Sequence, residues 1–292
     1  LRNSILGVNL NPTEVLLGNV PIFVDSTGDP ENWDYRLIEG SFAINLGVDV
    51  GLKTDLVGNS IKDQPDAGIY EYISPIILRQ PKKFYVNSAS STITEDGTII
   101  NPWKSIASLN TATIGLVPGD SIFFKSGETF KGKLNIDGSG IISKPIVISS
   151  YNTGPKPIIT TDASELISIV NQQYIVINGL SLTDLSMNLE DHSIQARTQY
   201  GILLSNAPNC TISNCSISLV GVGIATQSGS NFTNINNNTI SNLRAIRNTI
   251  GGEDDYGANG LVLGSSSNQI YQNIINDCWA TSFDYGYIGG AV

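Results

Sequence analysis

The chain has 292 residues, of which 40% are apolar and only 14% charged, with a formal net charge of −10. This acidic balance argues against nucleic acid as a partner, because binding phosphates requires clustered Lys and Arg. No apolar run reaches the roughly 18 residues of a membrane span. Leu1 to Gly7 also lacks the features of a signal peptide, so we expect a piece of a longer exported polypeptide.

Residues 1–72 begin with two short apolar runs, Ser4–Val8 and Val15–Val20, which are typical of short solenoid strands. Asp34-Tyr-Arg-Leu, Thr54-Asp-Leu-Val-Gly-Asn and Pro65-Asp-Ala-Gly-Ile-Tyr-Glu-Tyr follow in that order. This series resembles the closing segment of many secreted right-handed parallel β-helix proteins, except that Phe42 replaces a usual Pro. The resemblance implies that residues 1–72 are the terminal coils and closing segment of a preceding β-helix.

Residues 73–83 contain two prolines and a basic end, which predicts an interdomain linker. The pattern then restarts with Phe84-Tyr-Val, Asn101-Pro-Trp-Lys-Ser-Ile and Val117-Pro-Gly-Asp-Ser-Ile-Phe-Phe. These motifs resemble the opening of the pectate-lyase-like β-helix superfamily, in which a short capping helix covers the first coil. We expect one buried helical face from Trp103, Ile106, Ala107 and Leu109, because such a helix covers both apolar core and unpaired strand edges.

A closing segment therefore precedes an opening segment, which is the reverse of the order in one complete β-helix. The first explanation is a junction between tandem modules, with residues 84–292 forming the cap and first coils of a second, truncated β-helix. The alternative is a permuted single unit. Neighbouring β-helix modules of the same parent protein are accordingly expected partners.

Residues 209–277 repeat themselves, with copies of an Asn-rich motif starting at Asn209, Asn231 and Asn268. Gly201-Ile-Leu-Leu, Gly223-Ile-Ala-Thr and Gly260-Leu-Val-Leu each precede one copy. Units of this size cannot bury their own apolar face and must stack, which predicts an all-β parallel β-helix. Alternation places four earlier side chains inside as well: Ile175, Ile177, Leu180 and Leu182.

Two small features of the coils have structural explanations. The sequons at Asn209, Asn214, Asn231 and Asn237 follow the repeat, as expected if Asn occupies tight turns with positive φ. Cys210, Cys215 and Cys278 fit no metal spacing and are expected to be small buried residues.

Two polar excursions interrupt the coils at residues 184–200 and 244–259. Loops that leave a solenoid at fixed turns lie on one side of it and commonly form the binding face. They contain Arg197, Arg244 and Arg247, of which the last two are three residues apart and could face one groove. The sole histidine, His192, lies in the first excursion without a visible partner. The alternative is that these arginines are solvated or paired with neighbouring acids.

Glu253-Asp-Asp-Tyr-Gly-Ala-Asn-Gly and Trp279-Ala-Thr-Ser-Phe-Asp-Tyr-Gly-Tyr-Ile resemble a paired motif of uncharacterised members of this superfamily. Ile288 replaces the second acidic residue of that motif. We expect Asp254 and Asp255 to be metal ligands, with Ca²⁺ as the cation, because carboxylate oxygens suit a hard ion. We expect Tyr256, Trp279, Phe283 and Tyr285 to bind substrate by stacking on sugar rings. The alternative is solvated acids and aromatic residues that fill a widened coil.

Two functions fit this sequence. The first is an extracellular or cell-surface protein that interacts with a polysaccharide, and the resemblance implies a lyase-like or glycoside-hydrolase-like enzyme acting on an acidic polysaccharide. In that case Arg244, Arg247 and Asp284 are the expected catalytic residues. The alternative is a non-catalytic tandem β-helix that serves as an adhesin, stalk or coat and at most binds glycans, since the scaffold supports both.

Overall fold

The computed structural model describes residues 23–25, 27, 29–38, 41, 43–61, 64–72, 79–112, 115–188 and 190–292. The chain divides into two compact units, Leu1–Ile77 and Leu78–Val292. The division falls inside the segment that we interpret as a linker, of which residues 73–78 lie outside the described part.

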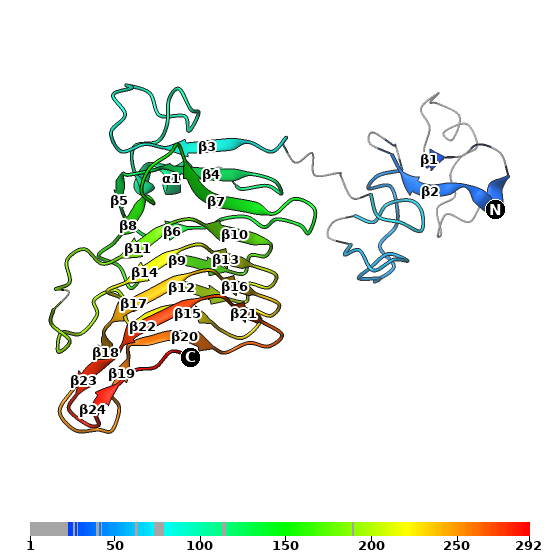
Figure 1. Ribbon diagram of the computed structural model, residues 1–292. Helices are drawn as coiled ribbons and strands as arrows, with labels where there is room; N and C mark the ends of the chain where they lie inside the picture. Colours follow the sequence, from blue (N-terminus) through cyan, green and yellow to red (C-terminus); the bar gives the residue numbers. More distant parts are fainter. Residues whose placement is uncertain are drawn as a thin grey trace. The chain divides into compact units, whose positions relative to one another are not determined.

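In the second unit, the coils form three parallel sheets (Figure 1). Sheet 1 contains β3 (Lys83–Val86), β4 (Ser121–Lys125), β7 (Ile146–Tyr151), β10 (Ile175–Asn178), β13 (Thr211–Ser213), β16 (Asn234–Asn236) and β21 (Gln269–Tyr271). Sheet 2 contains β5 (Thr129–Lys131), β8 (Ile158–Thr160), β11 (Ser181–Thr183), β14 (Ser216–Ser218), β17 (Thr239–Leu243) and β22 (Ile274–Cys278). Sheet 3 contains β6 (Leu134–Asn135), β9 (Glu165–Val170), β12 (Tyr200–Ser205), β15 (Val222–Thr226) and β20 (Asn259–Leu263). The predicted parallel β-helix is confirmed.

The core runs along the inside of the coils, where stacked apolar side chains lie in register. Ile177 pairs with Ile148 and with Ile212, and Ile212 pairs with Ile235. These isoleucines are fully buried, as are the predicted interior residues Ile175, Ile177, Leu180 and Leu182. Successive strand residues face opposite sides, so the alternation visible in the sequence is the alternation between core and surface.

The tight turns explain the repeated Asn and Gly residues. Asn209, Asn214 and Asn237 have φ of 59°, 53° and 56°, whereas at the sequon that begins with Asn231 it is Phe232 that has positive φ. Asn tolerates this left-handed region better than most residues because its short side chain can hydrogen-bond locally. The expected turn geometry is thus confirmed at three sequons.

A different requirement, room for the side chains of the neighbouring sheet, explains Gly201, Gly223 and Gly260. A Cβ on Gly201 would lie 2.6 Å from Ile217 Cγ2, and one on Gly223 would lie 2.6 Å from Ile240 Cγ2. Sheets 2 and 3 therefore approach each other only because these positions lack a side chain.

The expected cap is α1 (Ile106–Thr111), which begins after Ser105, whose side chain accepts a hydrogen bond from the Ser108 amide. Ile106 and Leu109 are buried, and Trp103 packs flat on Phe84 with ring centroids 5.2 Å apart. Ala107 is exposed, which corrects the expectation that it shares the buried face. The helix is so short that only its i and i+3 positions face the coil.

The first unit contains β1 (Phe23–Asp25) and β2 (Asp34–Leu37), which pair antiparallel, and a short 3₁₀ turn, η1 (Pro30–Asn32). Its small core contains Leu37, Ala43 and Ala67. Asp66 is buried and accepts hydrogen bonds from the amides of Asn45 and Tyr72, which explains the acid in the Pro65-Asp66 motif. The apolar runs before Val20 lie outside the described residues, so the closing-segment interpretation stays a prediction.

Candidate functional site

Three excursions leave the coils at the same corner, between sheet 2 and sheet 3. They span residues 184–199, 244–258 and 279–290, and we call them together the loop cluster. Between the first two, β14 and β15 are joined by residues 219–221 alone. This short connection allows the longer loops on either side to meet: the Ala196 amide donates to Ala245 O at 2.6 Å, and Gln195 Nε2 donates to Asn248 O at 2.8 Å.

The third excursion is attached to the first two by hydrogen bonds. The Thr281 amide donates to His192 O at 3.3 Å. Asn248 Nδ2 donates to Thr281 O at 3.0 Å, and the Phe283 amide donates to Asn248 Oδ1 at 3.1 Å. Two antiparallel hairpins, β18 (Ala245–Arg247) with β19 (Tyr256–Gly257) and β23 (Ala280–Ser282) with β24 (Gly286–Ile288), complete the loop cluster (Figure 1).

Three carboxylates converge in the loop cluster. Asp254, Asp255 and Asp284 each offer an oxygen that lies within 4.8 Å of the others. Ca²⁺ binds oxygen ligands at about 2.3–2.6 Å, so ligands on opposite sides of one ion lie about 5 Å apart. The separation therefore fits a single Ca²⁺ ion, and the carboxylate oxygens are the ligands that this ion prefers. The sequence predicted Asp254 and Asp255 as ligands and Asp284 as a catalytic residue, and the structure brings all three together.

Asp255 is the most buried of the three, and its oxygens are largely used by the protein. Oδ1 accepts from the Thr249 amide at 2.6 Å. Oδ2 accepts from Ser282 Oγ at 2.7 Å and from the Asp284 amide at 3.1 Å. Burial alone would raise the pKa of this carboxyl, but the hydrogen bonds hold the pKa below its usual value. Asp255 thus remains charged and orients the chain around the other two acids.

Arg247 and Asp254 form an ion pair at 2.5 Å, with about half of the arginine side chain exposed. Asp284 Oδ2 accepts from the Asp254 amide at 2.9 Å. Arg247, Asp254 and Asp284 therefore occupy one region of the surface, as expected of a site. Arg247 already supplies one positive charge there, so a bound cation would share Asp254 with it.

Arg244 does not join Arg247. Its side chain is fully buried, and it donates to Asp191 O at 2.9 Å, Leu243 O at 2.9 Å and Asn188 O at 3.2 Å. Burial lowers its pKa, with the charges of Asp191 and Glu190 opposing that effect. This arginine fastens the second excursion to the first, and its catalytic role stays a prediction.

The aromatic residues of the loop cluster differ in exposure. Phe283 is 65% exposed, Tyr285 52%, Tyr256 46% and Trp279 39%. One face of Trp279 is covered by His192, with ring centroids 3.8 Å apart and ring planes inclined by 4°. Tyr285 donates from its hydroxyl to Glu253 O at 2.5 Å. The substrate-binding assignment of these four residues stays a prediction, and His192 already covers one ring face of Trp279.

Sequence reasoning missed Tyr287, which is 71% exposed and packs edge-on against Trp279 with ring centroids 5.7 Å apart. Tyr287 follows Asp284 by three residues, and this closeness to a predicted site residue is the sequence feature that could have identified it. Asn248 was also missed, although it holds Phe283 in position, and nothing in its local sequence marks it. Ile288 packs against the core, so a charged residue at this position would lie beside apolar side chains.

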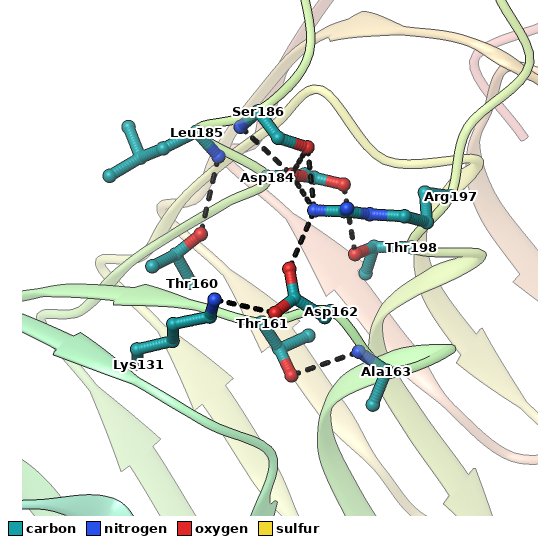
Figure 2. Close-up of polar contacts among 10 residues, drawn as sticks. All are labelled: Lys131, Thr160, Thr161, Asp162, Ala163, Asp184, Leu185, Ser186, Arg197 and Thr198. Atoms are coloured by element: carbon teal, nitrogen blue, oxygen red, sulfur yellow. Dashed lines mark hydrogen bonds and ion pairs between the residues drawn. The ribbon is translucent and has the colours of Figure 1, made fainter.

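Arg197 belongs to a separate polar cluster on an earlier part of the same corner (Figure 2). Its Nη2 donates to Asp162 Oδ1 and to Ser186 Oγ, both at 2.7 Å, and lies 3.4 Å from the buried Asp184. Lys131 contacts the other oxygen of Asp162 at 2.5 Å. Asp184 and Arg197 lie at opposite ends of the first excursion, so this cluster joins the two ends of that loop.

Comparisons with known proteins agree with the fold. Residues 158–287 match the family model described as the right handed beta helix region. Pectate lyase Pel9A superposes with a TM-score of 0.50 at 15% identity, covering 66% of this chain and 47% of that chain. The GH136 lacto-N-biosidase of Eubacterium ramulus gives 0.49 at 16% identity, covering 66% and 41%. The alginate lyase of Paenibacillus sp. str. FPU-7 gives 0.43 at 16% identity, covering 70% of each chain.

The family model and the superposition on pectate lyase Pel9A support one fold for this chain, a right-handed parallel β-helix. The chain spans less than half of the lacto-N-biosidase and of pectate lyase Pel9A. No curated protein sequence matches it. Among the described residues, no helix is long and apolar enough to cross a bilayer.

Proposed function

We propose that this chain is a polysaccharide-binding β-helix protein of the cell exterior, and that the loop cluster is its binding site. The observation that carries the proposal is the exposed aromatic surface of Tyr256, Phe283, Tyr285 and Tyr287 beside Asp254 and Asp284. Aromatic rings match the apolar faces of sugars, and exposed aromatic residues held by a rigid scaffold bind with little loss of conformational entropy.

The net negative charge of the loop cluster determines whether an acidic polysaccharide can bind there. Asp254, Asp255 and Asp284 lie together with Arg247 as their nearby cation. A sugar carboxylate would be repelled by this excess of negative charge unless a cation lay between them. Ca²⁺ on Asp254 and Asp284 would supply that charge and bridge protein and sugar. We therefore propose Ca²⁺-dependent binding of a polyuronate.

The test is affinity electrophoresis and calorimetry on polygalacturonate and alginate, with Ca²⁺ or with chelator. Binding should require Ca²⁺ and should weaken by about threefold to tenfold in each of Phe283→Ala and Tyr287→Ala, which remove one stacking ring. Phe232→Ala is the matched control, since Phe232 is 62% exposed at a turn outside the loop cluster. Equal weakening by the control, or no binding to either polyuronate, would refute the proposal.

Lyase activity is the second candidate, and the convergence of Arg247, Asp254 and Asp284 is the observation in its favour. In a lyase, a basic side chain removes the proton next to the uronate carboxylate while a cation neutralises that carboxylate. Incubation with the same polyuronates and Ca²⁺ should then release unsaturated products that absorb in the ultraviolet, and Arg247→Ala should abolish the signal. Binding without any product would leave the non-catalytic adhesin or stalk as the function.

A further inference from the structure

Two isoleucines are exposed at a tight turn just before β7. Ile141 and Lys144 exchange backbone hydrogen bonds of 3.1 and 2.9 Å, so Ile142 and Ser143 alone form the turn. Ile142 is 84% exposed and Ile141 44%. Turns of two residues ordinarily hold Gly, Asn or Asp, which suit both the backbone geometry and the solvent. The core of stacked coils includes neither isoleucine, so the fold does not account for them.

Three exposed lysines gather around this turn. Lys144 Cβ and the ring of Pro81 both border Gly119, at 3.6 and 3.0 Å from where a Cβ on that glycine would lie. Lys82 and Lys83 directly follow Pro81. In the part of the chain that the structure describes, none of the three lysines forms an ion pair. The two isoleucines and three lysines, which we call the basic tip, are Ile141, Ile142, Lys82, Lys83 and Lys144.

Charge is divided unevenly between the first coils and the later ones. Residues 79–156 contain nine Lys and Arg against five Asp and Glu, whereas residues 157–292 contain three against ten. Of the two acids that flank the basic tip in sequence, Asp120 is buried and paired with Arg79, and Asp137 is exposed. An anionic surface would therefore be attracted to the first coils and repelled by the later ones.

From these observations we infer that the basic tip docks on an anionic lipid bilayer. Ile142 enters the boundary between headgroups and acyl chains, and the lysines lie beside the anionic headgroups. A polysaccharide is a poorer match, because an aliphatic side chain has no ring to stack on a sugar. Two isoleucines alone bury little apolar area, so binding requires the turn and the lysines together. The basic tip lies on the first coils and the loop cluster on the later ones, so the two sites are separate.

The experiment measures cosedimentation of the full chain with two kinds of vesicle, phosphatidylcholine alone and equal parts of phosphatidylcholine and phosphatidylglycerol, in chelator so that no Ca²⁺ bridges form. Only the anionic vesicles should bind the chain, and binding should weaken as salt screens the lysines. Lys83→Gln and Lys144→Gln should each weaken binding about fivefold, the factor expected for one lysine near an anionic surface. Ile142→Ser should weaken binding about tenfold, because it removes the apolar contact.

Two exposed residues outside the basic tip provide matched controls. Ile250 is 85% exposed, like Ile142, but lies in the second excursion close to Glu253 and Asp254, so Ile250→Ser should leave vesicle binding unchanged. Lys156 is exposed and donates to Ser216 Oγ at 3.0 Å, and Lys156→Gln should likewise bind anionic vesicles as the wild type does. Thermal unfolding of each variant identifies any loss caused by misfolding.

Equal binding to both kinds of vesicle, or binding to neither, would overturn the inference. Equal weakening by Ile142→Ser and Ile250→Ser would overturn it as well. Self-association that disappears in Ile142→Ser, measured by sedimentation without lipid, would assign the basic tip to a second copy of the chain instead. Polyuronate binding is measured without vesicles and with variants of the loop cluster, so failure of this inference is distinguishable from failure of the proposed function.

Discussion

His192 and Trp279 stack face to face, with ring centroids 3.8 Å apart, although they are 87 residues apart in the sequence. His192 Nδ1 also lies 3.2 Å from Trp279 O and 3.4 Å from Nη1 of the buried Arg244. The first and third excursions therefore meet through one aromatic pair beside a buried cation. The lone histidine of the sequence has a structural partner that no local pattern reveals.

Loss of this stack should loosen the loop cluster while the coils stay folded. We expect His192→Ala to cost about 0.5–1.5 kcal/mol through the aromatic pair. A double-mutant cycle with Trp279→Ala, read by urea unfolding, isolates that coupling. Polyuronate binding should fall in both single variants, because Phe283 and Tyr287 belong to the same loop as Trp279. Additive effects of the two substitutions would show that the rings do not stabilise each other.

A second prediction concerns acid stability and Glu128, which ties the loop after β3 to the coil. Its Oε2 accepts from the Ser88 amide at 2.6 Å and Ser88 Oγ at 2.8 Å, and Lys125 lies 2.9 Å from Oε1. Burial raises the pKa of Glu128, but Lys125 and the Ser88 and Ala89 donors outweigh burial and hold the pKa below its usual value.

Because the folded pKa of Glu128 is depressed, its contribution to stability is complete above the unfolded pKa of about 4.3 and is lost as the pH falls through the folded value. Glu128→Gln should lower the urea midpoint at pH 7 and should lose less stability than the wild type between pH 5 and about pH 3. Parallel pH profiles for the two proteins would contradict this assignment.

A third prediction tests the interior placement of the cysteines. Cys210 and Cys215 are buried, and burial raises the pKa of each thiol to about 11. Cys278 is partly exposed, and burial together with Asp277 raises its pKa to about 11 as well. Thiolate is the reactive form, so the folded chain should react slowly with a disulfide reagent at pH 8, with Cys278 reacting first. Denaturation should expose all three thiols, and rapid reaction of Cys215 in the folded chain would contradict the fold.

The coils were predictable from sequence because each rung repeats one physical requirement. Ile212 must face the core, Asn214 must adopt positive φ, and Gly223 must leave room for Ile240, so each residue type recurs with the period of the coils.

The loop cluster was only partly predictable. The acids lie close together because one coil separates them, but the contact of Ala196 with Ala245 depends on the short connection at residues 219–221. The burial of Arg244 depends on backbone carbonyls of the first excursion. Every residue has a backbone carbonyl, so the sequence does not indicate which ones will accept these hydrogen bonds.

The last prediction concerns Asp120, the acid of the Val117-Pro-Gly-Asp motif. Its carboxylate is fully buried and accepts hydrogen bonds from the amides of Lys82 and Val117, both at 2.8 Å. It also pairs with Arg79 at 2.5 Å, and the Arg79 guanidinium lies 5.3 Å from the centroid of the Phe84 ring. Asp120 therefore anchors the chain that enters the first coil.

Asp120→Ala should destabilise the second unit by about 3 kcal/mol or more, because two backbone amides and one guanidinium lose a buried acceptor together. Asp120→Asn keeps the shape and one acceptor oxygen, so its loss should be smaller. Asp137→Ala removes an exposed acid from the same coil and should stay within about 0.5 kcal/mol of the wild type. Urea unfolding followed by tryptophan fluorescence, in a background with Trp33→Phe and Trp279→Phe, isolates the signal of Trp103, which packs on Phe84 and reports on this end of the β-helix. A loss for Asp120→Ala no larger than that of Asp137→Ala would mean that the entering chain is held by the strand pairing of β3 with β4 alone.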